Sequence, residues 1–173
     1  VALYGATKLT NELMAHSYSH LFGFSTIGLR FFTVYGPWGR PDMALFKFVN
    51  AILSDKEINV YNKGKMKRDF TYIDDIVDAV VKLSTTQSTN AKLYEIYNVG
   101  NGSPVDLMSY IATIEKVLNR QAKKKFLALQ PGDIEETWSD TTKLVNRIGP
   151  LLGTKIEVGI KNFVEWYLAY EKR

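Results

Sequence analysis

The amino-acid sequence predicts an α/β fold. Helical apolar patterns alternate with short apolar runs along all 173 residues, and few of these runs are joined as clean hairpins, an order typical of α/β proteins. The composition, 46% hydrophobic and 23% charged, is that of a globular chain long enough to bury a core. We find no internal repeat and no linker, so the sequence does not indicate a repeat array.

The first 42 residues predict one long helix, one strand and one loop. Apolar residues recur at helical spacing before Gly23, which predicts a helix over residues 4–21. They are Leu3, Ala6, Leu9, Leu13, Met14 and Leu21. Residues 25–32 are apolar and rich in β-formers, as in a buried strand. Residues 33–42 are dense in Gly and Pro and predict a loop.

The remaining residues continue the alternation. Runs rich in β-branched and aromatic residues predict strands over residues 58–61, 69–73, 94–99 and 126–129. Apolar residues at helical spacing predict helices over residues 43–54, 74–84, 106–119 and 159–172, with a short helix after residue 140. Asp42, Asp74 and Asp140 are expected to cap the helices that follow them. Turns or loops are predicted at residues 62–64, 87–92 and 131–133.

Charge and residue types exclude several classes of protein. Lys and Arg exceed Asp and Glu by 22 to 18, a mild excess that suits an anionic small molecule and does not call for nucleic acid. The basic residues cluster at residues 63–68 and 123–125. We interpret the second cluster as a solvated face, and we keep the first as a candidate binding site.

The chain is not expected to bind a metal or to cross a membrane. It has no cysteine, which excludes disulfides and thiolate ligands, and we interpret His16 and His20 as surface residues. No apolar run approaches the roughly 20 residues of a membrane helix. No glycine-rich phosphate loop follows any predicted strand, and helical spacing starts at Val1. We therefore expect the chain to begin in the middle of a fold, without the main binding element of a nucleotide cofactor.

Tyr4 and Lys8 form the most distinctive short-range pair. Four residues apart on the predicted first helix, they project from the same face. An ammonium close to a phenol favours its ionised form, which is how a tyrosine becomes a useful general base. Alone, this spacing is also common on exposed helices.

Three stretches together resemble the extended short-chain dehydrogenase/reductase family. They are the Tyr4 to Lys8 pair, residues 29–37 (LRFFTVYGP) and residues 67–75 (KRDFTYIDD). More narrowly, GPWGRPDMALF at residues 36–46 and the long stretch that ends at residue 75 resemble the UDP-glucuronate 4-epimerases. The resemblance extends through the Pro-Gly-Asp at residues 131–133 to the last helix.

The resemblance implies a set of site residues. Tyr4 is implied as the catalytic base and Lys8 as its partner; together with Phe31 they lie at the nicotinamide end of NAD. Substrate residues are implied at Thr33 and Arg40 for the sugar carboxylate, Arg68 for the diphosphate, Tyr61 for the uracil and Asp133 for the ribose. Each of these five also has a plain structural interpretation, as a loop, surface, core or turn residue.

The resemblance also implies the architecture. Residues 1–42 would be a remnant of a dinucleotide-binding domain, the C-terminal part of an NAD-binding Rossmann-type sheet. Residues 43–173 would be mainly a small α/β substrate domain for the UDP-sugar, with some segments returning to the first. Because pyrophosphate binding needs a glycine-rich loop that is absent, NAD is expected in the intact enzyme and not on this chain alone.

The implied reaction interconverts UDP-glucuronate and UDP-galacturonate through a 4-keto sugar in a cytoplasmic enzyme. A homodimer through the first helix is also implied. Two alternatives stay open. The chain could be a naturally truncated, non-catalytic module that binds UDP or a protein partner. It could also belong to a related sugar-nucleotide 4,6-dehydratase or decarboxylase, since these enzymes share the Tyr-x-x-x-Lys pair.

Overall fold

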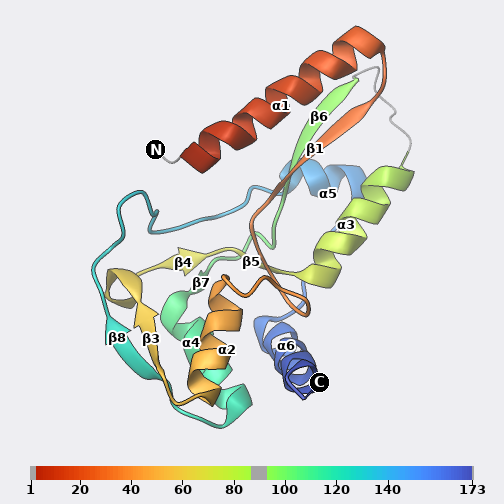
Figure 1. Cartoon of the computed structure of the whole chain (residues 1–173). Helices are drawn as coiled ribbons and strands as arrows, with labels where there is room; N and C mark the ends of the chain where they lie inside the picture. Colours follow the sequence, from red (N-terminus) through yellow and green to blue (C-terminus); the bar gives the residue numbers. More distant parts are fainter. Residues whose placement is uncertain (1–2, 87–92, 173) are drawn as a thin grey trace.

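The computed structural model describes residues 3–86 and 93–172. Figure 1 shows a long first helix, α1 (Leu3–Phe22), lying over a pair of strands at one end of the molecule. A larger body of helices and short strands forms the other end, and a loop from the body runs back toward the strand pair. The predicted helix over residues 4–21 is thus confirmed, with one more residue at each end.

The strand pair is a parallel two-stranded sheet. β1 (Thr26–Phe31) pairs in register with β6 (Tyr94–Val99), both close to their predicted bounds. On one face, α3 (Ile73–Thr85) and α5 (Thr142–Ile148) cover the strands and bury a small core. That core consists of Ile76, Ala79, Leu83, Tyr97, Val99 and Leu144.

The other face of this sheet is covered by α1, but mainly through polar contacts. The only buried residue of α1 is Ser19, whose hydroxyl lies 2.6 Å from the Phe24 carbonyl oxygen and 2.7 Å from that of Leu93. Glu12 accepts two hydrogen bonds from the Arg30 guanidinium, at 2.6 and 2.7 Å. The apolar side chains of α1 remain exposed: Leu3, Leu9, Leu13, Met14, Leu21 and Phe22.

The larger body holds the main core. Three helices, α2 (Ala44–Leu53), α4 (Leu107–Leu118) and α6 (Ile156–Tyr170), pack around two parallel strand pairs. One pair joins β2 (Thr33–Tyr35) to β5 (Phe70–Tyr72), and the other joins β3 (Glu57–Val60) to β8 (Lys123–Phe126). At the centre, the Phe70 and Tyr110 rings stack with centroids 4.0 Å apart. Aromatic stacking of this kind adds to the apolar burial.

Short elements lie beside the main core. The turn η1 (Tyr61–Gly64) follows β3, and β4 (Lys67–Arg68) pairs antiparallel with β7 (Val105–Asp106). On its other side, β4 is bridged by Lys67 to Glu136. We call residues 133–139 the strap, because this segment runs along β4 within the loop that leads from β8 to α5 (Figure 1).

The helix caps predicted at Asp42 and Asp74 are wrong. Met43 occupies the N-cap of α2, because Asp42 turns its carboxylate to Arg40 instead. Helix α3 begins one residue early, at Ile73, so Asp74 lies inside the first turn, where a carboxylate still favours the helix dipole. The N-cap of α5 is Thr141, and Asp140, one residue before it, accepts the backbone N–H of Thr142 at 2.9 Å.

Three strand predictions also need correction. Residues 33–35, predicted as loop, form β2, because their backbone pairs with β5. The strand placed at residues 126–129 is β8, at 123–126, because Lys123 lies opposite Glu57. β3 and β5 lie close to their predicted bounds, and although only a turn and β4 separate them in the sequence, β3 pairs with β8 and β5 with β2. The loop predicted at residues 87–92 lies outside the described residues.

Candidate active site

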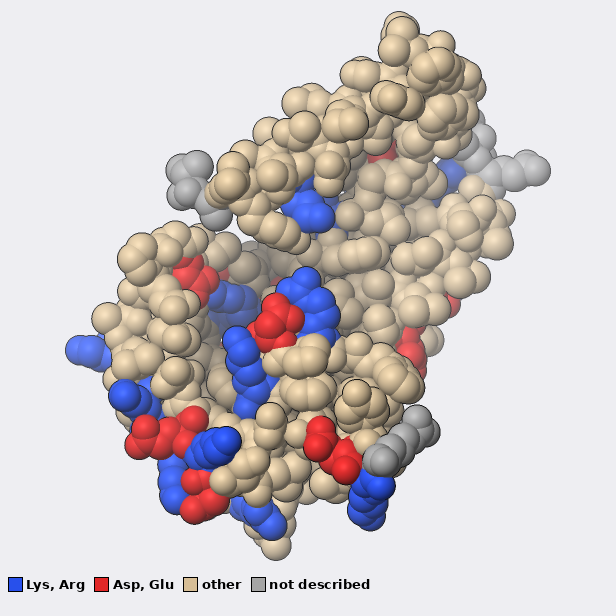
Figure 2. Space-filling model, in the orientation of Figure 1, with Lys and Arg blue, Asp and Glu red and all other residues tan. Residues whose placement is uncertain are grey.

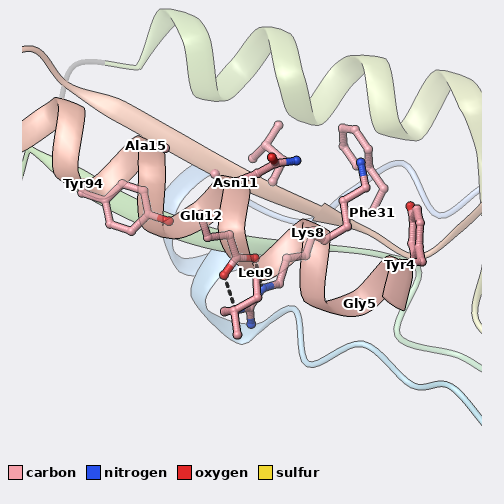
Figure 3. Close-up of a pocket in the computed structure, with 12 residues that line it drawn as sticks. Tyr4, Gly5, Lys8, Leu9, Asn11, Glu12, Ala15, Phe31 and Tyr94 are labelled. Atoms are coloured by element: carbon pink, nitrogen blue, oxygen red, sulfur yellow. Dashed lines mark hydrogen bonds and ion pairs between the residues drawn. The ribbon is translucent and has the colours of Figure 1, made fainter. Parts of the chain in front are cut away.

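Tyr4 and Lys8 lie one helical turn apart on α1 and face the sheet end that carries Phe31. The Lys8 ammonium nitrogen is 5.3 Å from the centroid of the Tyr4 ring. Both side chains and Phe31 line an open hollow of about 560 Å³ between α1 and β1. Figure 3 shows these three side chains at one end of the hollow and Tyr94 at the other. Three residues predicted to share the nicotinamide site are thus adjacent.

The groups with shifted pKa values in this hollow, Glu12 and Tyr94, lie away from Tyr4. The hydrogen bonds from Arg30 hold the pKa of Glu12 below its usual value. The pKa of Tyr94 is raised, first by burial and then by the nearby Glu12 carboxylate. Tyr94 therefore stays protonated at neutral pH, whereas Glu12 is ionised and already paired.

A second hollow, of about 370 Å³, shares Tyr4 and Phe31 with the first and is also lined by Arg40. Arg40 reaches it from the loop between β2 and α2. Gly36 starts this loop at a φ of +142°, and a Cβ there would lie 2.5 Å from Cγ2 of Ile73, so the backbone approaches α3 too closely for any side chain. The predicted base and the predicted carboxylate ligand therefore line the same cavity.

Trp38 anchors this loop to the last helix. Its ring centroid lies 5.3 Å from that of Trp166 and 6.0 Å from that of Tyr170 on α6. Trp38 itself adopts a φ of 62°, an uncommon conformation for a bulky residue. Trp38 was not predicted as a site residue, although its position between Gly-Pro and Gly-Arg in the sequence is a signal for it.

Thr33 and Arg40 meet at a smaller pocket of about 30 Å³ beside the main core. The Arg40 guanidinium is exposed and forks onto the Asp42 carboxylate, with N–O distances of 3.1 and 2.8 Å. This is the planar, two-point geometry with which arginine binds carboxylates. The residues that the resemblance implies for a sugar carboxylate therefore lie together.

Arg68 and Asp133, 65 residues apart in the sequence, are joined by an ion pair of 2.9 Å. The other terminal nitrogen of Arg68 donates to the carbonyl oxygens of Lys67 and Glu135, at 2.9 and 3.1 Å. The guanidinium is thereby held between β4 and the strap. Tyr61 is half-buried at the start of η1 and lines none of the hollows described above.

The charged side chains are unevenly distributed. Figure 2 shows Lys, Arg, Asp and Glu gathered over the larger body, while the visible face of α1 carries almost none. Within residues 3–86 and 93–172, no cluster of His, Cys, Asp and Glu could hold a metal ion. No helix in these ranges has both the length and the apolar character needed to span a bilayer.

Comparison with known proteins identifies the family. The family model described as "NAD dependent epimerase/dehydratase family" matches residues 1–100, more than half of the chain. The chain belongs to the NAD-dependent epimerase/dehydratase family. The predicted membership in the extended short-chain dehydrogenase/reductase group is thus confirmed.

The relatives of this epimerase/dehydratase family member include both an uncharacterised protein and a named enzyme. An uncharacterised 37.6 kDa protein of Escherichia coli O111:H- is 54% identical and matches 99% of the chain over 56% of its own length. A probable UDP-glucuronate 4-epimerase of Rhizobium meliloti is 45% identical, over 96% of the chain and 53% of its own length. The chain thus spans about half the length of the curated relatives it matches.

A solved structure confirms the predicted fold class. The UDP-glucuronic acid 4-epimerase of Bacillus cereus, in complex with UDP-glucuronic acid and NAD, superposes with a TM-score of 0.89 at 31% identity. The match covers 96% of this chain and 52% of that one. The β1 and β6 pair with its helices is therefore Rossmann-type. The domain division at residues 42 and 43 stays a prediction. In the structure, β1 pairs with β6, and Ile27 and Leu29 of β1 pack against the small core that α3, β6 and α5 form.

Proposed function

We propose that this chain provides the catalytic helix and the UDP-sugar site of an NAD-dependent enzyme that interconverts UDP-glucuronate and UDP-galacturonate. The observation that carries the proposal is the shared hollow of Tyr4 and Arg40, which brings a phenolic base and a carboxylate-binding fork to one cavity. The relatives named as UDP-glucuronate 4-epimerases support the choice of sugar. A cytoplasmic location is part of the same proposal.

Tyr4 is the proposed base. Its phenolic oxygen takes the proton of the sugar 4-hydroxyl and gives it back after the keto sugar has rotated to present its other face. The Lys8 ammonium, 5.3 Å from the ring, stabilises the negative charge that the base carries in this exchange. Tyr4 is 71% exposed on the described chain, so no internal contact blocks a substrate from reaching its oxygen.

The residues around Tyr4 fit the nicotinamide end of NAD. The hollow that Tyr4, Lys8 and Phe31 line combines an aromatic wall with a cationic donor suited to ribose hydroxyls. When bound, NAD would supply a reversible hydride acceptor for carbon 4 of the sugar, and Tyr4, Lys8 and Phe31 would hold its nicotinamide end. The residues of this chain orient the sugar and move its proton.

Arg40 and Thr33 are the proposed carboxylate ligands. A 4-keto group β to a carboxylate promotes loss of carbon dioxide, so a uronate epimerase has to hold the carboxylate firmly. The fork that Arg40 forms on Asp42 has the required geometry, and a substrate carboxylate would take the place of Asp42. The Thr33 hydroxyl lies at the same pocket and can donate a further hydrogen bond.

The nucleotide is proposed to bind along β4 and the strap. Arg68 offers a half-buried guanidinium, with its side chain 17% exposed, that two carbonyl oxygens already orient. A preoriented arginine loses little side-chain entropy when it binds phosphate. Asp133 is proposed to bind the ribose hydroxyls and Tyr61 to contact the uracil.

The exposed apolar face of α1 is proposed to be an interface. Parallel strands are normally covered on both faces, yet α1 contributes almost no apolar burial to this sheet. We propose that further dinucleotide-binding structure and the α1 of a second subunit cover this face. Each Å² of apolar surface so buried contributes roughly 25 cal/mol.

Arg68→Ala is expected to weaken UDP binding to the chain by more than tenfold. The charge-assisted hydrogen bonds of the guanidinium to phosphate are worth about 1.5–3 kcal/mol, which corresponds to this factor or more. Isothermal titration with UDP measures the loss. Arg120→Ala is the matched control, since Arg120 donates to the Leu53 carbonyl, away from the strap. Equal affinities for the two variants would contradict the role given to Arg68.

A further inference from the structure

Asp69 is a fully buried carboxylate that follows Arg68 directly. Its exposed fraction is 0%, and it lies between β4 and β5 in a chain whose other acidic residues are mostly on the surface. Burying an ionised carboxylate is costly unless hydrogen bonds compensate for the lost water. Hydrogen-bond donors around Asp69 replace the water that the carboxylate loses on burial.

Four donors from two separate segments converge on Asp69. The backbone N–H of Asn101 donates to one carboxylate oxygen at 2.9 Å. The other oxygen accepts the N–H of Gly102 and the N–H of Ser139, both at 3.0 Å, and also the Ser139 hydroxyl. A carboxylate group, with acceptor sites on both oxygens, can take all four of these hydrogen bonds.

The backbone around Asp69 is shaped for this arrangement. A Cβ at Gly100 would lie 2.3 Å from the Ser139 Oγ and 3.1 Å from an Asp69 oxygen. Any side chain at position 100 would therefore push Ser139 away from the carboxylate. Gly100, which follows the last residue of β6, lets the strap approach closely enough for Ser139 to reach Asp69.

The strap is fastened along its whole length to β4. Lys67 donates its N–H to the Glu135 carbonyl at 2.9 Å and accepts the N–H of Thr137 at 3.2 Å. The Asp69 N–H donates to the Thr137 hydroxyl at 3.1 Å. Asp69 thus holds the strap at Ser139, while the Arg68 guanidinium meets the strap near its start.

We propose that Asp69 is a positioning residue that fixes the strap against β4 and thereby sets the orientation of Arg68. The proposal deepens the proposed function, on which it rests, because Arg68 is the proposed diphosphate ligand. Asp69 has no exposed atom with which to touch a ligand, so it acts through Arg68. When Ser139 is released, the carbonyl of Glu135 no longer orients the guanidinium.

Asp69→Asn tests the proposal, because the amide keeps the shape of the side chain but turns an –NH₂ toward N–H donors. Hydrogen exchange of residues 133–139, followed by mass spectrometry without ligand, is expected to speed up at least tenfold. UDP affinity is expected to fall at least tenfold. In the Arg68→Ala background the same substitution should change UDP affinity by less than threefold, because both residues act through one contact.

The matched control is Asp75→Asn. Asp75 is also a buried carboxylate, and it accepts the N–H and the hydroxyl of Thr154 at 2.9 and 2.7 Å, at the start of α3. Its substitution should lower the free energy of unfolding in urea but leave strap exchange and UDP affinity within twofold. If Asp69→Asn does not fold, Ser139→Ala removes one of the four donors and should show the same changes at smaller size.

Three outcomes would overturn the proposal. The first is unchanged strap exchange in a folded Asp69→Asn or Ser139→Ala chain. The second is an undiminished loss of UDP affinity in the Arg68→Ala background, and the third is an equal loss in Asp75→Asn. If the unsubstituted chain fails to bind UDP, the proposed function fails, whereas the exchange measurement still decides whether Asp69 holds the strap.

Discussion

Replacing Tyr4 by phenylalanine is expected to lower turnover by about 100-fold or more, with UDP-sugar binding retained, since a positioned acid–base group contributes roughly 10²–10⁴-fold. The measurement uses a completed enzyme, in which this chain is joined to the part of the Rhizobium meliloti relative that it does not match. Phenylalanine keeps the ring over which Lys8 lies and removes only the oxygen that exchanges the proton.

Tyr18→Phe provides the matched control for this prediction. Tyr18 is an exposed tyrosine on the same helix, and its ring contacts Phe22 with centroids 5.3 Å apart. Loss of its hydroxyl should leave turnover within twofold. A turnover for Tyr4→Phe within tenfold of the unsubstituted enzyme would mean that another group moves the proton.

Arg40→Ala is expected to change the product and not only the rate. Without the guanidinium fork, the enzyme no longer holds the carboxylate of the keto sugar. Part of this intermediate should therefore release carbon dioxide and leave a pentose nucleotide beside the epimer. Mass spectrometry of the nucleotide products of the completed enzyme measures this partition. The identity of the product reports directly on the fate of the keto intermediate, which a change in substrate affinity does not.

Asp42→Asn is the control for Arg40. It weakens the ion pair that occupies the fork but leaves the guanidinium in place, so the product should remain a clean epimer. A clean epimer from Arg40→Ala as well would remove the main support for a uronate substrate. An ordinary hexose would then be the better assignment.

The helices could be predicted from the sequence because each is a local pattern of apolar residues. The periodicity that predicts α1 is real, although most of its apolar residues are exposed and its contacts with the sheet are largely polar. Spacing alone cannot reveal this, because it does not say what a face packs against. The short strands β2 and β4 were missed, because β2 lies in a stretch dense in Gly and Pro and β4 in a basic stretch, and both are strands only through partners distant in the sequence.

The site was predictable in two different ways. The adjacency of Tyr4 and Lys8 follows from their spacing on one helix, and the structure places them together, whereas the role given to them follows from the family resemblance. The meeting of Arg68 with Asp133 follows only from the family resemblance, because 65 residues separate them. Asp69 was missed as a buried acceptor, because its donors come from residues 101–102 and 139, and a carboxylate beside an arginine is usually an exposed ion pair.

The most direct test of the proposed reaction follows deuterium at carbon 4 of UDP-glucuronate in the completed enzyme with NAD. If the hydride leaves carbon 4 and returns to its opposite face, mass spectrometry and NMR should show UDP-galacturonate that retains the deuterium, with no net consumption of NAD. Three results would contradict this account: no epimer from UDP-glucuronate while UDP-glucose is epimerised, conversion of dTDP-glucose to a 4-keto-6-deoxy sugar, or an epimer that has exchanged its deuterium with water.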